Sequence, residues 1–224
     1  TVNSSNNNPV VRALGFGAGS AGHFETLVAN NAPALVTGKR GTGPALRVDY
    51  LAGTGDLAVF QVAGVNRARI DNTGAGFFNG GVNGSGADVA EAFEVEGDRA
   101  TYTPGDVLVI SNAHDRRVAK SAEPYSTRVI GVHATKPGLL LTDRDLSANF
   151  DDTVPLGVIG VIPTKVTTEG GAIRRGDLLV TSSVPGHAMK GTDRSRMLGA
   201  VIGKALQEFD GGGSGVILVL VNVR

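Results

Sequence analysis

The chain contains no cysteine and no tryptophan, and these absences remove several classes of function at the outset. Without cysteine there is neither a disulfide framework nor a thiolate metal site, and the composition does not report the redox compartment. With no tryptophan and only three tyrosines, the chain also has few aromatic platforms of the kind that polysaccharide-cleaving enzymes use. The composition therefore argues against a depolymerase, although polar loops can still bind a surface.

Net charge and long apolar segments are missing as well. Lysine plus arginine equals aspartate plus glutamate at 21 each, so no net field attracts nucleic acid or an anionic membrane. The pairs Arg116-Arg117 and Arg174-Arg175 lack stacking neighbours and are typical of turns. The longest apolar run, residues 215–223, has the length of a strand, whereas a membrane-spanning helix needs roughly 18 residues. We expect no nucleic acid partner and no membrane insertion.

Glycine is the residue that the chain has in excess. Its 33 glycines are about twice the ordinary share, and glycine or proline interrupts each window before a helical pattern of 3.6 residues builds up. Valine is abundant and alternating apolar runs are short, which predicts an all-β protein with many tight turns. The chain begins without an initiator methionine or a signal segment, so we expect a fragment or a processed product, and what precedes Thr1 stays open.

Residues 15–80 contain an imperfect short repeat, a Gly-x-Gly-like turn followed by a short apolar strand. Copies begin at Gly19, Gly41 and Gly53, with a degenerate copy at Asn31. Their apolar anchors follow one another at 11, 11 and 13 residues and are Phe24, Leu35, Leu46 and Val59. Strands this short cannot bury a core within one chain, but stacked repeats or three chains wound about one axis can. The pattern predicts a shaft of short β-repeats over residues 1–80, built either by stacking the repeats or by intertwining three chains.

The shaft ends in a hairpin and a flexible joint. Residues 62–78 alternate in polarity around a turn at Asn72-Thr-Gly74, which predicts two antiparallel strands. The glycine-rich run that follows has the composition of a linker. We therefore place a joint at residues 81–87 and a second domain at 88–224.

The second domain carries an internal duplication. Residues 104–111 match residues 175–182 at an offset of 71, and Ala119-Lys120 and residues 129–131 have counterparts at offsets of 70 and 72. Each copy predicts a turn, a strand, a polar hairpin and a strand. Two further runs, 157–163 and 215–223, are almost continuously apolar, which indicates strands buried on both faces, inside a sandwich or barrel or at a subunit interface. We expect a sandwich-like or barrel-like head with this duplication.

Motifs for cofactors and metals are weak. No helix follows the Gly-x-Gly segments, so they predict turns rather than a phosphate loop, and no Gly-x-Ser-x-Gly elbow is present. The four histidines lack ligand spacing. His114 and His187 lie in the polar hairpins of the two copies, where a fold or a threefold axis could join them at a metal, but solvated loop histidines explain them as well. We expect no cofactor.

One acidic segment remains as a candidate for catalysis. Asp88, Glu91, Glu94 and Glu96 follow directly after the glycine-rich run. If residues 88–93 form a helical turn, Asp88 and Glu91 share one face and can act as an acid/base pair with one raised pKa. Alternatively, residues 85–88 cap a short helix, and Glu94 and Glu96 are the solvent face of a strand. The structural interpretation is favoured, and Asp88 and Glu91 remain the candidates for catalysis.

Seven segments of the chain resemble the recurring signature of bacterial and phage fibre-like proteins. They are residues 77–81, 86–91, 102–110, 120–132, 135–138, 163–166 and 176–190. In these proteins a glycine-rich shaft ends in a β-rich C-terminal domain. The resemblance covers residues 77–224, and residues 15–76 are more loosely similar to the repeats of tail fibres and trimeric surface fibres. It implies a homotrimeric fibre, extracellular or virion-borne, whose end domain trimerises the chain or contacts a receptor or a neighbouring component.

Two alternatives follow from the same resemblance. The C-terminal domain is distantly similar to self-cleaving intramolecular chaperones on phage appendages, which implies an enzyme that cuts its own chain near the joint. No cleavage dyad maps onto this chain residue by residue, so Asp88 and Glu91 are candidates by position and chemistry alone. A baseplate, cage or surface-lattice component is the third hypothesis. The receptor or ligand is not identified by the sequence.

Overall fold

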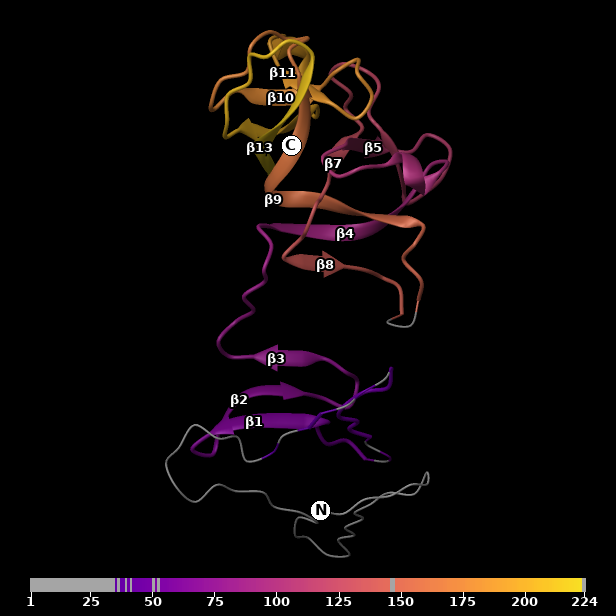
Figure 1. Ribbon diagram of the computed structural model, residues 1–224, viewed down its shortest axis with the longest axis vertical. Helices are drawn as coiled ribbons and strands as arrows, with labels where there is room; N and C mark the ends of the chain where they lie inside the picture. Colours follow the sequence, from indigo (N-terminus) through magenta and orange to yellow (C-terminus); the bar gives the residue numbers. More distant parts are fainter. Residues whose placement is uncertain are drawn as a thin grey trace, which may run out of the picture. The chain divides into compact units, whose positions relative to one another are not determined.

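The computed structural model describes residues 35, 37–38, 40, 42–49, 51, 53–145 and 148–222 (Figure 1). The chain divides into two compact units, Thr1–Gly81 and Val82–Arg224. In the described residues, strands and turns dominate and the helical elements are single 3-10 turns, so the predicted all-β class is confirmed. No helix in this part of the chain has the length and apolar character needed to cross a membrane.

The first unit contains an antiparallel three-stranded sheet in the order β1-β2-β3. Its strands are β1 (Ala58–Val62), β2 (Val65–Ile70) and β3 (Gly76–Phe78). The predicted hairpin is confirmed, since β2 pairs with β3 around a turn at Asp71–Ala75. The Asp71 carboxylate accepts hydrogen bonds from the backbone N–H groups of Thr73 and Ala75, and Gly74 takes the left-handed φ of +88° that the turn requires.

The repeat upstream of this sheet is only partly described. The copy at Gly53 yields β1, but the strand expected around Leu46 is not formed, because residues 42–49 have no strand pairing and Leu46 stays exposed. A short strand is stable only where pairing and burial stabilise it, and neither is present there within one chain. The copy at Gly19, with Phe24, lies outside the described residues, and of the copy at Asn31 the anchor Leu35 is described and is exposed.

The second unit is built on a ten-stranded sheet in the order β11-β10-β12-β13-β9-β7-β5-β6-β4-β8. Its elements are β4 (Asp88–Val95), η1 (Arg99–Thr101), β5 (Val107–Ile110), β6 (Arg117–Lys120), β7 (Val129–His133), β8 (Leu139–Leu141), β9 (Thr153–Thr167), β10 (Leu178–Thr181), β11 (Ala188–Lys190), η2 (Arg194–Arg196), β12 (Val201–Ala205) and β13 (Ser214–Asn222). Additional pairings of β9 with β4 and with β11 close this sheet on itself twice. The result is two small barrels that share β9.

We call these barrels the first ring (β4, β6, β5, β7 and the first half of β9) and the second ring (the second half of β9, β11, β10, β12 and β13). Corresponding strands pair in the same way in both. β4 is parallel to β6, as β9 is to β11. β5 and β7 shift register between Leu108 and Val109, and β10 and β12 shift between Leu179 and Val180, 71 residues later.

Each ring has a glycine at the equivalent position of one strand, and close backbone packing explains why a larger residue does not fit there. A Cβ on Gly131 in β7 would lie 2.4 Å from the Gly157 carbonyl oxygen, and a Cβ on Gly203 in β12 would lie 2.1 Å from the Leu220 carbonyl oxygen. Neither strand could keep its neighbour with a larger residue there. The Val-Ile-Gly segment in each copy therefore marks the place where β7 approaches β9 and β12 approaches β13.

Buried residues fill both rings and join them. The core of the first ring includes Leu108, Val118 and Leu156. The second core fills the second ring and also takes in the outward-facing valines of the first ring. These valines are Val107, Val109, Val129 and Val132. The outer face of the first ring is thus packed against the second ring, and the two form one folded unit.

Burial along β13 differs from expectation. Its residues alternate, with Ile217, Val219 and Val221 buried in the second ring and the intervening apolar residues exposed. Within a single chain only one face of this run is buried, because the ring supplies an interior for one face only. The predicted alternative, a subunit interface on the other face, stays a prediction. The outward residues are Val216, Leu218 and Leu220.

Candidate functional site

The acidic segment is a strand and not a helical turn. Residues 88–95 form β4 and pair along their length with β9, from Asp88 opposite Gly160 to Glu94 opposite Thr153. The helix expected over 88–93 is therefore wrong. The backbone groups of residues 88–95 pair with β9, and this tertiary pairing favours a strand over a helical turn.

The strand also separates the predicted acid/base pair. Residues three apart in a strand point to opposite faces, so Asp88 and Glu91 do not converge. The Glu91 carboxylate contacts Arg116 Nη2 at 3.1 Å, while Asp88 is buried on the other face. A shared proton between these two acids is not supported by this geometry.

Asp88 by itself is in an unusual environment. Its Oδ2 is buried and finds no hydrogen-bond partner among the described residues, and burial raises the pKa of this carboxyl. Glycines make room for it, since a Cβ on Gly160 would lie 2.5 Å from the Asp88 Cα. The Asp88 carbonyl also accepts a hydrogen bond from Gly138 N–H at 2.8 Å. The raised pKa makes this carboxyl a better candidate proton donor than an ordinary aspartate.

Glu94 and Glu96 are only partly exposed, and both have partners. Glu94 contacts Arg117 at 3.0 Å and Arg144 at 2.9 Å. Glu96 accepts hydrogen bonds from Ser111 Oγ and from the ring of His114, and these hold its pKa below the usual range. Both glutamates are therefore anionic anchors for loops of the first ring.

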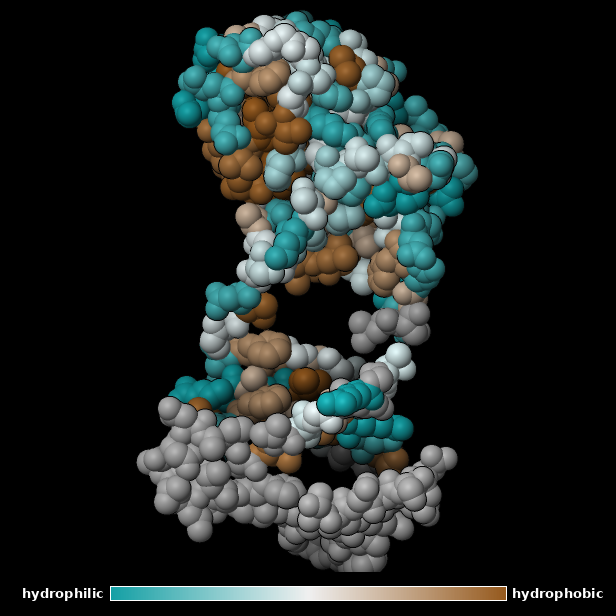
Figure 2. Space-filling model, viewed as in Figure 1, coloured by the Kyte–Doolittle hydropathy of each residue, from teal (hydrophilic) through white to brown (hydrophobic). Residues whose placement is uncertain are grey.

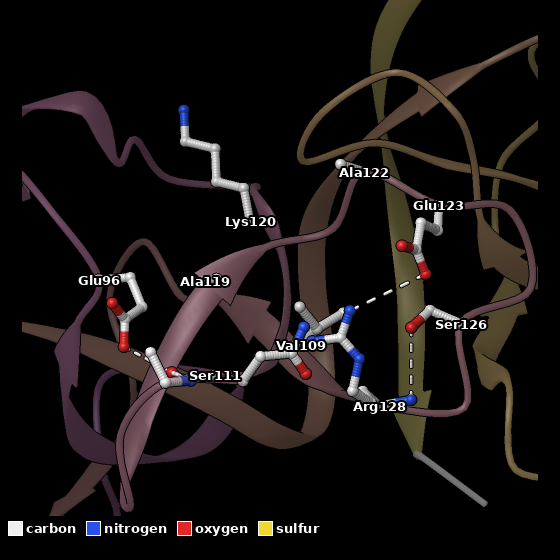
Figure 3. A pocket seen from close by; sticks show the side chains of 11 residues that line it. Glu96, Val109, Ser111, Ala119, Lys120, Ala122, Glu123, Ser126 and Arg128 are labelled. Atoms are coloured by element: carbon white, nitrogen blue, oxygen red, sulfur yellow. Dashed lines mark hydrogen bonds and ion pairs between the residues drawn. The ribbon is translucent and has the colours of Figure 1, made fainter.

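A pocket of about 270 Å³ opens beside Glu96 (Figure 3). Its polar side chains come from both sides, with Glu96 and Ser111 on one side and Glu123, Ser126 and Arg128 on the other. Val109, Ala119 and Ala122 also line it. Charges of both signs, with Arg128 3.9 Å from Glu123, suit a small polar group better than an apolar one.

The serine, histidine and glutamate in this region do not form a nucleophilic triad. Ser111 and His114 both bond to the same oxygen of Glu96, so no base lies between the serine and the acid. Ser111 Oγ also accepts hydrogen bonds from the backbone N–H groups of Ala113 and His114. The cluster holds the 111–114 turn in place and has no geometry for acyl transfer.

The two histidines proposed for a metal have separate local partners. His114 bonds to Glu96, and Nδ1 of His187 lies 2.8 Å from the carbonyl oxygen of Pro185. Across the described ranges, no group of three or more potential ligands could hold a metal ion. His23 lies outside these ranges.

The most buried charged group among the described residues was not identified from the sequence. Asp106 is 1% exposed and lies where the rings meet. Its carboxylate bonds to Lys165 Nζ at 2.5 Å, contacts Lys120 Nζ at 3.3 Å and accepts the Thr103 N–H at 2.9 Å. Burial alone would raise the pKa of Asp106, but these donors outweigh it and lower the pKa.

The duplication carried the signal for this cluster. Asp106 and Lys120 are among the residues that recur in the second copy, as Asp177 and Lys190, and that pair is also formed, at 2.9 Å. The sequence matched these positions without pairing them. Lys165 lies in β9 between the copies, so no repeat could reveal it.

Beside this cluster lies a buried histidine. His133 is 3% exposed, and its Nδ1 has no partner among the described residues. Burial lowers its pKa to about 4, and the positive charge of Arg99 acts in the same direction. His133 is therefore neutral at ordinary pH.

No protein-family model matches the chain, and no curated protein matches its sequence. Among solved structures, the fold is similar to that of the pre-mature bacteriophage phi29 gene product 12, with a TM-score of 0.51 and 17% identity. The match covers 70% of this chain and 25% of the phage protein, so the chain corresponds to about a quarter of its length. A C-terminal fragment of the same phage protein matches with a TM-score of 0.43 and 17% identity, over 60% of this chain and all of the fragment. The fold of this chain is thus similar to one found in a bacteriophage gene product.

Proposed function

We propose that the chain is a structural component of a virion, part of a fibre or appendage, that assembles as a homotrimer. The similarity in fold to a bacteriophage gene product supports the setting. The count of three copies rests on the likeness of the upstream repeats to fibre shafts. The polar pocket of Figure 3 is the part of the second unit best suited to contact a receptor or a neighbouring component.

The observation that carries self-association is the sheet of the first unit. No residue of β1, β2 or β3 is buried within the chain, and Phe60 is 55% exposed. An isolated small sheet needs a covered hydrophobic face to be stable. Further copies of the same strands provide such a cover, with no other protein required. Its other exposed apolar residues are Val59, Val62, Val65, Phe77 and Phe78.

The test is the mass of the native protein. We expect light scattering to give three times the 22.9 kDa chain mass, and Phe60→Glu to shift the protein to monomer, because a buried carboxylate without a partner opposes assembly. Asn72→Glu, in the exposed turn of the same unit, is the matched control and should stay trimeric. A wild-type monomer would overturn the proposal. Negative-stain images would separate a fibre from a baseplate, cage or lattice.

A second candidate function, cleavage of the chain by itself, is favoured by Asp88. This buried acid, whose pKa is raised by burial, lies two residues after the glycine-rich segment 83–86 and borders a groove of about 420 Å³. In the proposed step one water adds to a peptide carbonyl of the 82–87 segment and the C–N bond breaks. Asp88 donates its proton to the leaving nitrogen and takes up the proton that the water loses, and the products are a carboxyl group and an amine.

Intact-mass measurement of the purified full chain tests this candidate. We expect two fragments from the wild type and a rate at least about 100-fold lower for Asp88→Asn, in line with the loss of a general acid. Glu91→Gln should cleave like the wild type, since Glu91 faces away and binds Arg116. Equal behaviour of wild type and Asp88→Asn would exclude the role of Asp88.

A further inference from the structure

The outer face of the second ring is apolar and open. Leu178 of β10, Lys204 of β12 and Leu220 of β13 stand opposite one another in one row across three strands. Leu198 adjoins them at 92% exposed, and with them it borders a depression of about 570 Å³. Apolar side chains gather over β13 and β9 on the visible side of this unit (Figure 2). We call the surface formed by Leu178, Leu198, Lys204 and Leu220 the second-ring outer face.

The first ring has the same row. Val107 of β5, Val132 of β7 and Gly157 of β9 stand opposite one another, in the positions that Leu178, Lys204 and Leu220 take in the second ring. In the first ring this row is buried, and both valines are 0% exposed. One surface of the duplicated barrel is thus buried in one copy and open in the other.

The buried copy shows what such a face packs against. Val107 and Val132 belong to the core that fills the second ring, so their cover is another barrel of the same kind. Backbone hydrogen bonds seal the contact, from Val107 N–H to the Gly186 carbonyl and from Lys165 N–H to the Gly105 carbonyl. The fold therefore already contains one ring-on-ring contact through this face.

We propose that the second-ring outer face binds a second copy of this chain, as the contact between neighbouring heads of the assembly. The proposal rests on the trimer put forward above and assigns its head contact. A ring-on-ring contact joins two different surfaces, and such head-to-tail contacts close into cyclic assemblies when the rotation allows it.

The chemistry of the face agrees with this occupant. Its lining contains no carboxylate, and Lys204 is its only formal charge. Lys204 can extend its ammonium group to the rim while its methylene groups pack, as lysine side chains do at interfaces. A leucine as exposed as Leu198, in a contiguous apolar surface, is typical of an interaction site.

The absence of cysteine makes labelling the sharpest test. Leu198→Cys and Ile110→Cys each introduce the sole thiol of the chain. Ile110, 47% exposed on β5, lies outside the face and serves as the matched control. In the native trimer we expect maleimide to label Leu198→Cys at least about tenfold more slowly than Ile110→Cys, because labelling requires the interface to open. Both should react equally fast in denaturant.

Light scattering on the same samples separates the outcomes. A trimer in which Leu198→Cys labels as fast as Ile110→Cys would overturn this inference and leave the trimer standing. A protected Leu198→Cys in a monomer would assign the face to another part of the same chain, and would overturn both proposals. Leu220→Asp, on the same face, should also lower the trimer fraction, whereas Ile110→Asp should not.

Discussion

Replacing Asp106 by asparagine is expected to destabilise the second unit by about 3 kcal/mol, because breaking a buried ion pair leaves a charge without compensation. Two lysines, Lys165 and Lys120, direct their ammonium groups at this carboxylate. Asparagine keeps the shape and can still accept the Thr103 N–H, so the loss reports the charge. The measurement is urea unfolding followed by circular dichroism, with the midpoint falling at unchanged slope.

The duplicated barrel provides the control. Asp177→Asn removes the equivalent carboxylate of the second ring, which is more exposed and has a single lysine partner, Lys190. We expect a loss of about 1 kcal/mol or less there, as for other solvent-exposed pairs. Equal losses at both positions would contradict the view that Asp106 is special because it lies between the rings.

Acidification is the second large effect that we expect, and its source is His133. The folded state holds the pKa of His133 at about 4, below the ordinary value of 6.5. Because the unfolded chain takes up the proton more readily, stability falls as the pH drops from about 6.5 toward 4. The full effect is about 3 kcal/mol, from the linkage of proton binding to folding. Asp106, whose pKa is lowered, adds its own loss only below its ordinary pKa of 3.8.

Urea midpoints measured between pH 7 and pH 4 test this prediction. His133→Gln should flatten the curve in that window, whatever its stability at pH 7, because the slope depends on protons bound and not on packing. Equal slopes for the wild type and His133→Gln between pH 6.5 and pH 4 would contradict the assignment, because Asp88, whose raised pKa acts in the opposite sense, is present in both proteins.

The sequence predicted the all-β class, the hairpin of β2 and β3, and the strands of the head, because these depend on local alternation and on turn residues. The sequence-based prediction of a helical turn at residues 88–93 was wrong. The same residues are compatible with a helix cap and with a strand, and pairing with β9 stabilises the strand. For β13 the sequence showed that both faces are apolar, but an apolar run does not say whether the same chain or another copy covers the second face. The Asp106 cluster could not be predicted from the sequence, because Lys165 reaches Asp106 only when the rings close.

The shared strand β9 has a consequence for synthesis of the chain. The first ring needs residues only up to Gly160 and can close while the second copy is still being made. At that stage its outward valines, Val107 and Val132 among them, have not yet met the second ring that covers them. During synthesis the outer surface of the first ring is therefore apolar and exposed until β10 to β13 have been made and cover it. We therefore expect the speed of translation over residues 161–222 to affect how much of the protein aggregates.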